Sequence, residues 1–148
     1  MFDLDANKAI ALRLVEVFNG RRLDLLDDVL HPEFRARGIS AFPPVGREIG
    51  PNAHRKLYEM FYQAIHDARA EVLDVVAEGD NVAVDDRFGG THRGDFLGHP
   101  GTGRRIEWVA IHNYTLRDGK VLEHATMTDA LAIIQQIRLV PSLTKAAE

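Results

Sequence analysis

Apolar residues recur at helical spacing in the first 66 residues of this chain. Ile10, Leu14 and Phe18 illustrate the pattern, which places their side chains on one buried helix face. Asp5 precedes this first apolar series and is expected to cap its helix. The same reasoning, with the intervening turn signals, predicts three helices and one short strand, at residues 7–18, 23–30, 51–66 and 34–37.

From residue 70 onward the apolar residues alternate with polar ones, which is the period of a β-strand. This alternation predicts four strands, at residues 70–77, 82–91, 104–116 and 120–126. A last helix is predicted to begin at Asp129. Helices followed by antiparallel strands are typical of an α+β fold. We expect one domain, residues 1–148, in which N-terminal helices wrap a strongly bent antiparallel sheet into a cone with an internal pocket.

The turn between the last two predicted strands decides whether His112 and His124 meet. If residues 117–119 form a three-residue loop with a left-handed glycine, His112 pairs with His124. If the turn consists of residues 118–119 alone, His124 opposes Asn113 and the two histidines lie on opposite faces. The longer loop is preferred because it needs a positive φ only at its glycine.

In the preferred register one face of this hairpin mixes aromatic, titratable and hydroxyl side chains. Its members are Trp108, Ala110, His112, Tyr114, Leu122, His124, Thr126 and Thr128. A pure core would not carry this mixture, because each buried polar group needs a partner, so the face predicts a pocket. The opposite face is apolar and is expected to meet another subunit of a homo-oligomer. It comprises Val109, Ile111, Val121 and Met127.

Composition narrows the classes of function. The 148 residues include no cysteine, which excludes disulfides and thiolate metal sites. The formal charge of −4 argues against a nucleic-acid partner, and no apolar run is long enough to span a bilayer. The acidic start lacks the features of a signal peptide, so we expect a cytoplasmic protein without a membrane partner. Two histidines are too few for a metal site, and no cofactor is expected.

Four segments of the C-terminal two-thirds carry a family resemblance. They are residues 77–84 (AEGDNVAV), 90–98 (GTHRGDFLG), 102–108 (TGRRIEW) and 118–124 (DGKVLEH). In this order they resemble the SnoaL-like polyketide cyclase family of the nuclear-transport-factor-2-like superfamily. The resemblance implies a cofactor-free intramolecular aldol ring closure on a polyketide ester. In that reaction a base removes a proton from an acidic methylene, and a donor meets the acceptor carbonyl.

The chain departs from the family pattern at two positions. In the family, an Asp two residues after the histidine matching His124 serves as acid and base, and this chain has Thr126 there. A threonine hydroxyl can donate a hydrogen bond, but it cannot act as a base near neutral pH. Arg37 stands where the family has a histidine shortly after the second helix.

The candidate catalytic residues are His112 and His124, because histidine titrates near neutral pH, with Thr126 and Tyr114 as donors to the enolate. The alternative for each histidine is a hydrogen-bonded structural role. Asp129 is either a replacement carboxylate or an ordinary helix cap.

Further candidates for the pocket each have a plainer alternative. Asp85 and Arg87 share a strand face and are either pocket groups or a solvated pair. His92 lies at the pocket mouth or shapes a turn. Three more aromatic residues are candidates for a lid over the pocket, or simple packing residues: Phe42, His54 and Tyr58.

Two main functions follow. The first is a proton-transfer enzyme acting on a hydrophobic ketone or ester, as a polyketide cyclase does. The second is a binding or accessory protein that kept the pocket and lost the carboxylate, which the threonine at position 126 supports. A related hydroxylase or isomerase is a third possibility. All three predict a small hydrophobic ligand.

Overall fold

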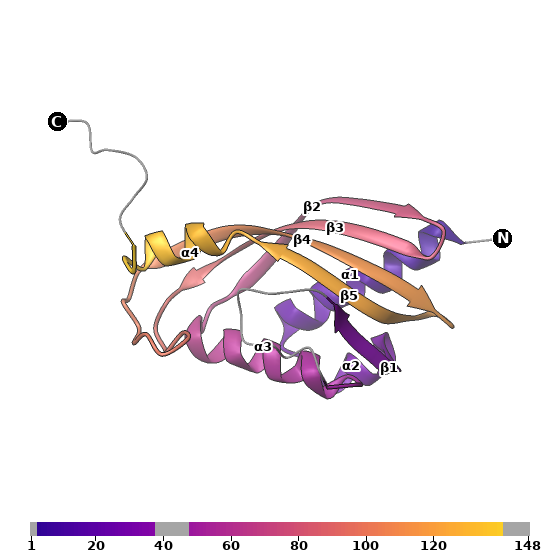
Figure 1. Cartoon of the computed structure of the whole chain (residues 1–148), viewed down its shortest axis with the longest axis horizontal. Helices are drawn as coiled ribbons and strands as arrows, with labels where there is room; N and C mark the ends of the chain where they lie inside the picture. The colour runs from indigo at the N-terminus through magenta and orange to yellow at the C-terminus, as the bar shows by residue number, and fades with distance from the viewer. Residues whose placement is uncertain (1–2, 38–47, 141–148) are drawn as a thin grey trace.

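Within residues 3–37 and 48–140, which this computed structural model describes, four α-helices and one 3-10 helix accompany five strands (Figure 1). In chain order the elements are α1 (Leu4–Gly20), η1 (Leu23–Leu25), α2 (Leu26–Val29), β1 (Leu30–Arg37), α3 (Asn52–Ala64), β2 (Arg69–Glu78), β3 (Asn81–Thr91), β4 (Arg105–Arg117), β5 (Lys120–Thr128) and α4 (Ala130–Gln136). The α+β prediction is confirmed. The second predicted helix is shorter than expected, because its last residue already begins β1.

The first helix begins three residues earlier than its apolar pattern suggests. Asp3, and not Asp5, is its N-cap, since the Asp3 carboxylate accepts a hydrogen bond of 2.9 Å from the amide of Ala6. Asp5 lies inside the first turn, where its charge still complements the helix dipole. At the other end Arg21 adopts the left-handed conformation (φ 54°), and its amide bonds back to the carbonyls of the last turn.

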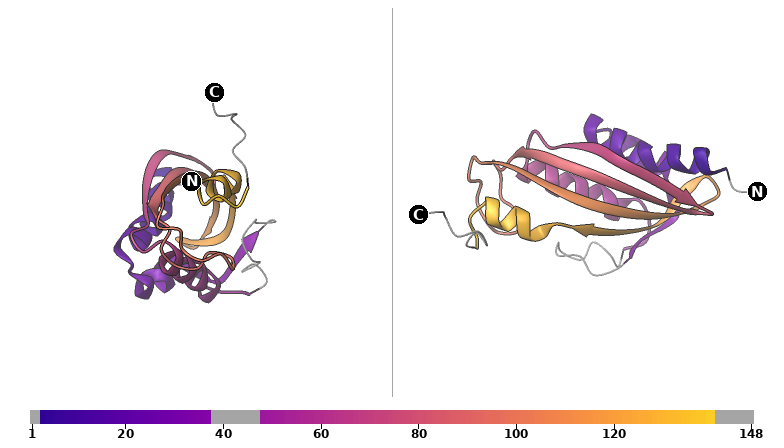
Figure 2. Two further views of the ribbon diagram at one scale, coloured as in Figure 1. Left: turned by 90° about the vertical axis from the view of Figure 1, so that its left-hand side faces the viewer. Right: turned by 90° about the horizontal axis from the view of Figure 1, so that it is seen from above.

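The five strands form one sheet in the order β1-β5-β4-β3-β2. Four strands pair antiparallel as predicted, but β1 runs parallel to β5, so the sheet is mixed. The parallel pairing follows from the chain path, because β1 precedes α3 and β5 follows the whole antiparallel series. Figures 1 and 2 show the sheet curling over α1 and α3, which pack against its concave face.

Two apolar clusters fill the space between sheet and helices. The first joins α1, α2 and β1 to the concave face and includes Leu14, Leu26, Phe34, Val84 and Leu116. The second lies at the other end of the sheet and includes Phe18, Ile65, Phe96, Trp108 and Ile133. Burying one such side chain stabilises the fold by about 1.5–3 kcal/mol. Together the clusters fix the curvature of the strands that carry the polar residues between them.

The β4–β5 hairpin contains a turn of two residues, so the preferred three-residue loop is wrong. Arg117 pairs with Lys120, and both turn residues have positive φ, 52° at Asp118 and 72° at Gly119. This is the dihedral pattern of a type I′ turn, whose twist matches that of the strands. Asp tolerates the left-handed region better than most residues, which removes the objection to the shorter turn.

A β-bulge next to this turn restores the expected face. Leu116 pairs with Val121, whereas Thr115 pairs with Glu123, so Leu122 is an extra residue in β5. The bulge shifts every later pair by one residue. His112 therefore opposes Thr126 and not His124, yet both histidines project from the same face of the sheet. The shorter turn alone would have separated them.

Candidate active site

The two histidines of the hairpin form a direct hydrogen bond on the concave face. Nδ1 of His112 on β4 lies 2.8 Å from Nε2 of His124 on β5. They are diagonal neighbours, because His112 opposes Thr126 and His124 opposes Tyr114. One ring nitrogen must donate and the other accept, so the pair shares a single proton between these two atoms.

Aromatic rings hold this pair in place. The Tyr114 ring stacks on His124 with a centroid separation of 4.8 Å. From the helical side, His54 on α3 meets His124 edge-on at 5.2 Å, and Tyr58 lies 4.5 Å from His54. Offset and edge-to-face contacts of this kind stabilise ring orientation as well as packing. Of the predicted lid residues, His54 therefore lies directly against His124, and Tyr58 contacts His54.

A buried carboxylate that sequence reasoning missed completes the cluster. Asp86 on β3 is 1% exposed, and its Oδ2 atom lies 3.7 Å from Nε2 of His112. That separation is longer than a direct hydrogen bond. Asp86 opposes Ala110 on β4, so it neighbours His112 diagonally across the ladder.

Of the two alternatives for Asp85 and Arg87, the structure favours solvated positions on the outer face. Arg87 is exposed and contacts Glu71 at 3.7 Å on the outer face, and Asp85 shares that face by alternation. The signal for Asp86 was present in the sequence. Asp86 has the same strand parity as Val82 and Val84, and both valines are fully buried.

Burial sets the protonation of this cluster. Burial, with a smaller contribution from Asp85, raises the pKa of Asp86 to about 6. Burial lowers the pKa of His112 to about 4, and burial together with the charge of His112 lowers that of His54 to about 3. The pKa of His124 falls well below its ordinary value for the same reasons. At neutral pH the cluster therefore holds an ionised carboxylate beside neutral imidazoles.

The ionised carboxylate favours one arrangement of the shared protons. A negative Asp86 favours a proton on Nε2 of His112, the nitrogen that faces it. Neutral His112 then accepts at Nδ1, so His124 donates from its Nε2 atom. Asp86, His112 and His124 thus form an oriented chain from β3 to β5.

Four buried polar atoms of this cluster have no hydrogen-bond partner within residues 3–37 and 48–140. They are Asp86 Oδ1, His112 Nε2, Thr126 Oγ1 and His54 Nε2. Buried polar atoms are nearly always paired, so unpaired ones on one face indicate a place where a ligand or water binds. Both donors and acceptors are available there, as general acid–base chemistry requires.

An aromatic surface adjoins the polar cluster. Phe88 stacks on Trp108 at 5.4 Å with an interplanar angle of 7°, and Phe61 from α3 stacks on the same indole at 6.0 Å. Phe88 also meets His112 edge-on at 5.9 Å. The predicted pocket residue Trp108 therefore belongs to an aromatic group that reaches the titratable one.

Comparison with known proteins decides the family. The family model described as SnoaL-like polyketide cyclase matches residues 8–137. The chain belongs to the SnoaL-like polyketide cyclase family. The C-terminal motifs that suggested this resemblance lie within the matched range.

Individual members of the SnoaL-like family align over most of the chain. Aklanonic acid methyl ester cyclase DnrD of Streptomyces peucetius is 29% identical over 126 residues, which are 84% of this chain and 86% of DnrD. AclR of Streptomyces galilaeus, which has been proposed to be a hydroxylase, superposes with a TM-score of 0.83 at 26% identity, covering 97% and 91% of the two chains. A protein from Jannaschia sp. CCS1 assigned to the same family gives 0.81 at 28% identity, covering 93% and 95%.

Two predicted residues of this SnoaL-like protein lie apart from the cluster. Asp129 is exposed, and its carboxylate accepts a hydrogen bond of 2.9 Å from the amide of Ala132. Of its two predicted roles, Asp129 therefore has that of the helix cap, at the start of α4. His92 is buried six residues beyond Asp86, roughly 20 Å along the strand direction. Its Nδ1 atom lies 3.1 Å from the Thr102 hydroxyl, which favours the turn-shaping alternative. Phe42 lies outside the described residues.

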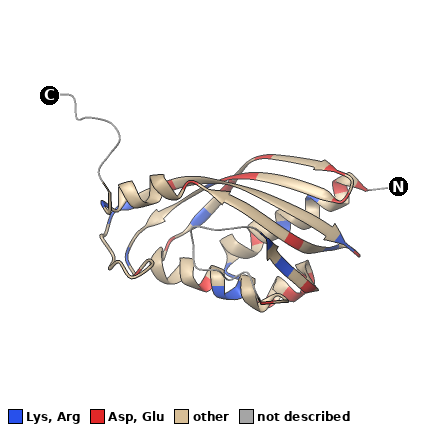
Figure 3. Cartoon of the chain, viewed as in Figure 1, with Lys and Arg blue, Asp and Glu red and all other residues tan. Residues whose placement is uncertain are grey.

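Three of the four apolar residues predicted for the outer face of the β4–β5 hairpin are exposed there. Val109, Ile111 and Met127 are 44%, 54% and 75% exposed. Val121 is fully buried in the core, because the bulge pairs it with Leu116 on the concave side. Acidic and basic residues are interspersed over helices and strands (Figure 3).

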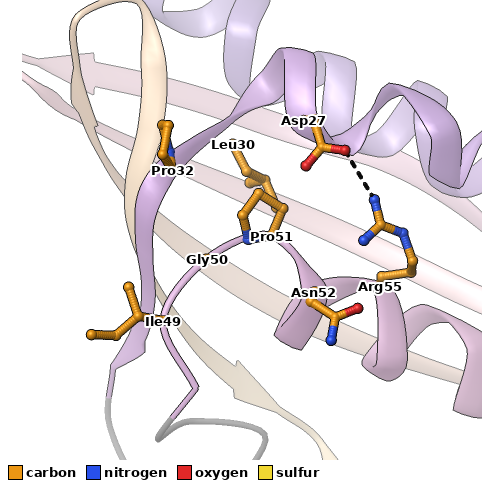
Figure 4. Close-up of a pocket in the computed structure, with 8 residues that line it drawn as sticks. All are labelled: Asp27, Leu30, Pro32, Ile49, Gly50, Pro51, Asn52 and Arg55. Atoms are coloured by element: carbon orange, nitrogen blue, oxygen red, sulfur yellow. Dashed lines mark hydrogen bonds and ion pairs between the residues drawn. The ribbon is translucent and has the colours of Figure 1, made fainter.

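A hollow of about 370 Å³ lies between α2, β1 and the start of α3 (Figure 4). Its lining residues are Asp27, Leu30, Pro32, Ile49, Gly50, Pro51, Asn52 and Arg55. The charged groups there already pair with each other, since Arg55 contacts Asp27 at 3.2 Å. This hollow shares no residue with the histidine cluster, and it offers no comparable acid–base group.

Neither a membrane-spanning helix nor a metal-binding group is found in the described ranges. No helix there is long and apolar enough to cross a bilayer. In the same residues, no set of three or more His, Asp or Glu side chains is arranged to hold a metal ion.

Proposed function

We propose that this SnoaL-like protein catalyses a cofactor-free intramolecular aldol ring closure of a polyketide-like ketone or ester. The observation that carries the proposal is the hydrogen bond between His112 and His124 beside the buried Asp86. A carboxylate with a pKa near neutrality and neutral imidazole donors together suit proton abstraction and enolate stabilisation. The similarity to cyclases named for aklanonic acid methyl ester supports a polyketide methyl ester as the substrate class.

The aromatic group next to the cluster supports a planar substrate. The stacked rings of Phe88 and Trp108 make the surroundings of His112 aromatic and apolar, which suits a flat, conjugated ligand. The reacting carbonyls would then lie near His112, which the Phe88 ring contacts. His112 Nε2 and the Thr126 hydroxyl are the donors that we assign to the enolate oxygen.

Incubation with a panel of aromatic polyketide methyl esters tests this function. Ring closure by an aldol reaction leaves the mass unchanged, so the product appears at a new retention time and NMR shows one ketone carbon replaced by a carbinol carbon. His112→Gln should lower kcat/KM by at least about 100-fold, the range of general acid–base catalysis. His66→Gln, at an exposed histidine outside the cluster, should leave it unchanged.

A non-catalytic binding role is the second candidate function, and Thr126 favours it. The hydroxyl cannot replace a carboxylate base near neutral pH. Under this alternative, panel esters bind and perturb Trp108 fluorescence, but none is converted. AclR has been proposed to be a hydroxylase, so insertion of oxygen into an ester is a further outcome of the same assay. A mass increase of one oxygen atom would reveal this outcome.

We also propose that the protein is a homo-oligomer formed through the outer face of the sheet. Val109, Ile111 and Met127 expose a contiguous apolar stripe on neighbouring strands, and such surfaces are usually covered.

We propose a cytoplasmic location, because a chain without cysteines cannot form the disulfides that are typical of proteins in oxidising compartments.

A further inference from the structure

We infer that Asp86 is the base that removes the substrate proton, in place of the carboxylate that the family carries at the position of Thr126. The inference rests on the proposed function and deepens it. It assigns proton abstraction to β3, on which Asp85 and Arg87 were candidate pocket residues but no catalytic residue was predicted.

Positions 86 and 126 lie on β3 and β5, the two strands that flank β4. Asp86 on β3 opposes Ala110, and Thr126 on β5 opposes His112, two residues further along the same face of β4. Both positions therefore neighbour His112, one from each side. Ala110 contributes only a methyl group between them, which leaves room for a ligand carbon. A carboxylate moved from β5 to β3 remains beside the same imidazole.

Asp86 is the only buried acidic residue within residues 3–37 and 48–140. Its Oδ1 atom has no partner among these residues, and its Oδ2 atom makes only the long contact with His112. Asp85, its neighbour in the chain, lies on the outer face of the sheet, and two acidic residues of β5 and the start of α4 are engaged elsewhere. Glu123 contacts Arg37 at 3.6 Å, and Asp129 caps α4. The free oxygen of Asp86 is therefore the acceptor that can meet a substrate hydrogen.

The proposed step balances without a co-reactant. The Asp86 carboxylate takes a proton from the methylene carbon, the C–H bond breaks, and its electron pair forms the enolate. The enolate carbon then bonds to the ketone carbon, and the carbonyl π pair moves to the ketone oxygen. That oxygen takes the proton back from the Asp86 carboxylic acid. His112 and Thr126 donate hydrogen bonds to the enolate oxygen throughout.

Proton exchange separates this step from ring closure. Methyl benzoylacetate has an acidic methylene but no second ketone to attack, so it can exchange hydrogen without cyclising. In D₂O the protein should accelerate loss of the methylene NMR signal above the buffer rate. Asp86→Asn should lower this enzyme-dependent rate at least about 100-fold. Glu71→Gln, an exposed acidic residue of the adjacent strand β2, is the matched control and should stay within twofold.

Returning the carboxylate to β5 provides a gain-of-function test. In the double variant Asp86→Asn with Thr126→Asp, exchange should recover at least tenfold over Asp86→Asn alone. Thermal unfolding of each variant tests whether the fold is retained.

The pH profile gives a second measurement that does not depend on a variant. The wild-type exchange rate should rise through a midpoint near pH 6 as Asp86 ionises. The other titratable groups facing Asp86 are Tyr58 and His54 from α3, His112 and Tyr114 from β4, and His124 from β5. The pKa values of all these groups lie outside the range of pH 5 to 7. The pKa is about 4 for His112, about 3 for His54, and well below the ordinary value for His124. The pKa values of the two tyrosines are raised well above 10.

Three results would overturn the assignment: wild-type exchange no faster than buffer, exchange by Asp86→Asn within twofold of wild type, or no inflection between pH 5 and 7. If the wild type exchanges protons but closes no panel ester, the cyclase proposal fails while Asp86 stands as the base.

Discussion

Asp86 on β3 and His112 on β4 place a carboxylate oxygen and an imidazole nitrogen 3.7 Å apart in an almost solvent-free interior. The two residues do not oppose each other in the ladder, and the gap between their polar atoms exceeds a hydrogen bond. The Oδ1 atom of Asp86 and the Nε2 atom of His112 have no hydrogen-bond partner among the described residues, so one substrate molecule can contact both groups. Most of the expected properties of the protein depend on this arrangement.

The hydrogen bond of His124 can be removed while its ring packing is kept. His124→Phe retains a ring against Tyr114 but leaves Nδ1 of His112 without its partner. We expect turnover of a panel ester to fall at least about 10-fold, and the free energy of unfolding to fall by about 1–3 kcal/mol, the cost of an unpaired buried polar group. Steady-state kinetics and urea unfolding measure the two effects. Unchanged turnover would assign His124 a purely structural role.

The three histidines of the cluster should make the protein acid-sensitive. The folded state holds His54, His112 and His124 neutral, with pKa values below the ordinary 6.5. The unfolded chain takes up protons below pH 6.5, so the free energy of unfolding falls as the pH decreases from 6.5 toward 4. Each histidine contributes up to about 1.4 kcal/mol per pH unit. Urea unfolding at several pH values measures the slope.

Replacing His54 tests the origin of that slope. His54→Phe keeps an aromatic ring beside His124 and Tyr58 and removes one titrating group. We expect the slope of stability against pH to decrease by about one proton. An unchanged slope would show that His54 is already protonated in the folded protein.

Asp86 should act on stability in the opposite direction. Its folded-state pKa is raised to about 6 from 3.8, so the folded protein loses stability as the pH rises from about 4 to 6. Asp86→Asn removes this penalty, and the variant should be more stable than wild type at pH 7 by up to about 3 kcal/mol. Denaturant unfolding at pH 7 measures the difference. A destabilised variant would mean that the ionised carboxylate is held by stronger contacts than those in the structure.

The outer face of the sheet should govern assembly. Ile111→Glu places a charge at the centre of the exposed apolar stripe and should reduce the molar mass measured by light scattering to that of one chain. Arg87→Glu on the neighbouring strand serves as a control for a general change in charge. If Ile111→Glu leaves the mass unchanged, the stripe does not form the contact between subunits.

Periodicity predicted most of the fold because the helices and antiparallel strands each bury one face. Ile10, Leu14 and Phe18 marked α1, and alternating valines marked β3. The start of β1 gave no such signal, since His31, Pro32 and Glu33 do not alternate with apolar residues and its partner β5 is almost ninety residues away. Parallel pairing depends on the path of the whole chain.

The candidate site was predicted in part, and for a reason that was partly wrong. The shared face of His112 and His124 was correct, but the loop that was meant to produce it does not exist. Turn chemistry is local, whereas the bulge at Leu122 depends on how β5 packs. Asp86 was not predicted because Asp85 and Arg87, which lie on the outer face of β3, were taken as the candidates. Val82 and Val84 have the same strand parity as Asp86 and are buried, so they indicate the inner face.

The extra residue Leu122 also restricts how this hairpin can change in length. Deleting Leu122 while the two-residue turn is kept would exchange the inward and outward positions of the rest of β5. His124 and Thr126 would then point to the solvent side, and Met127 would enter the interior. The reactive lining and the outer apolar stripe therefore depend together on this one extra residue.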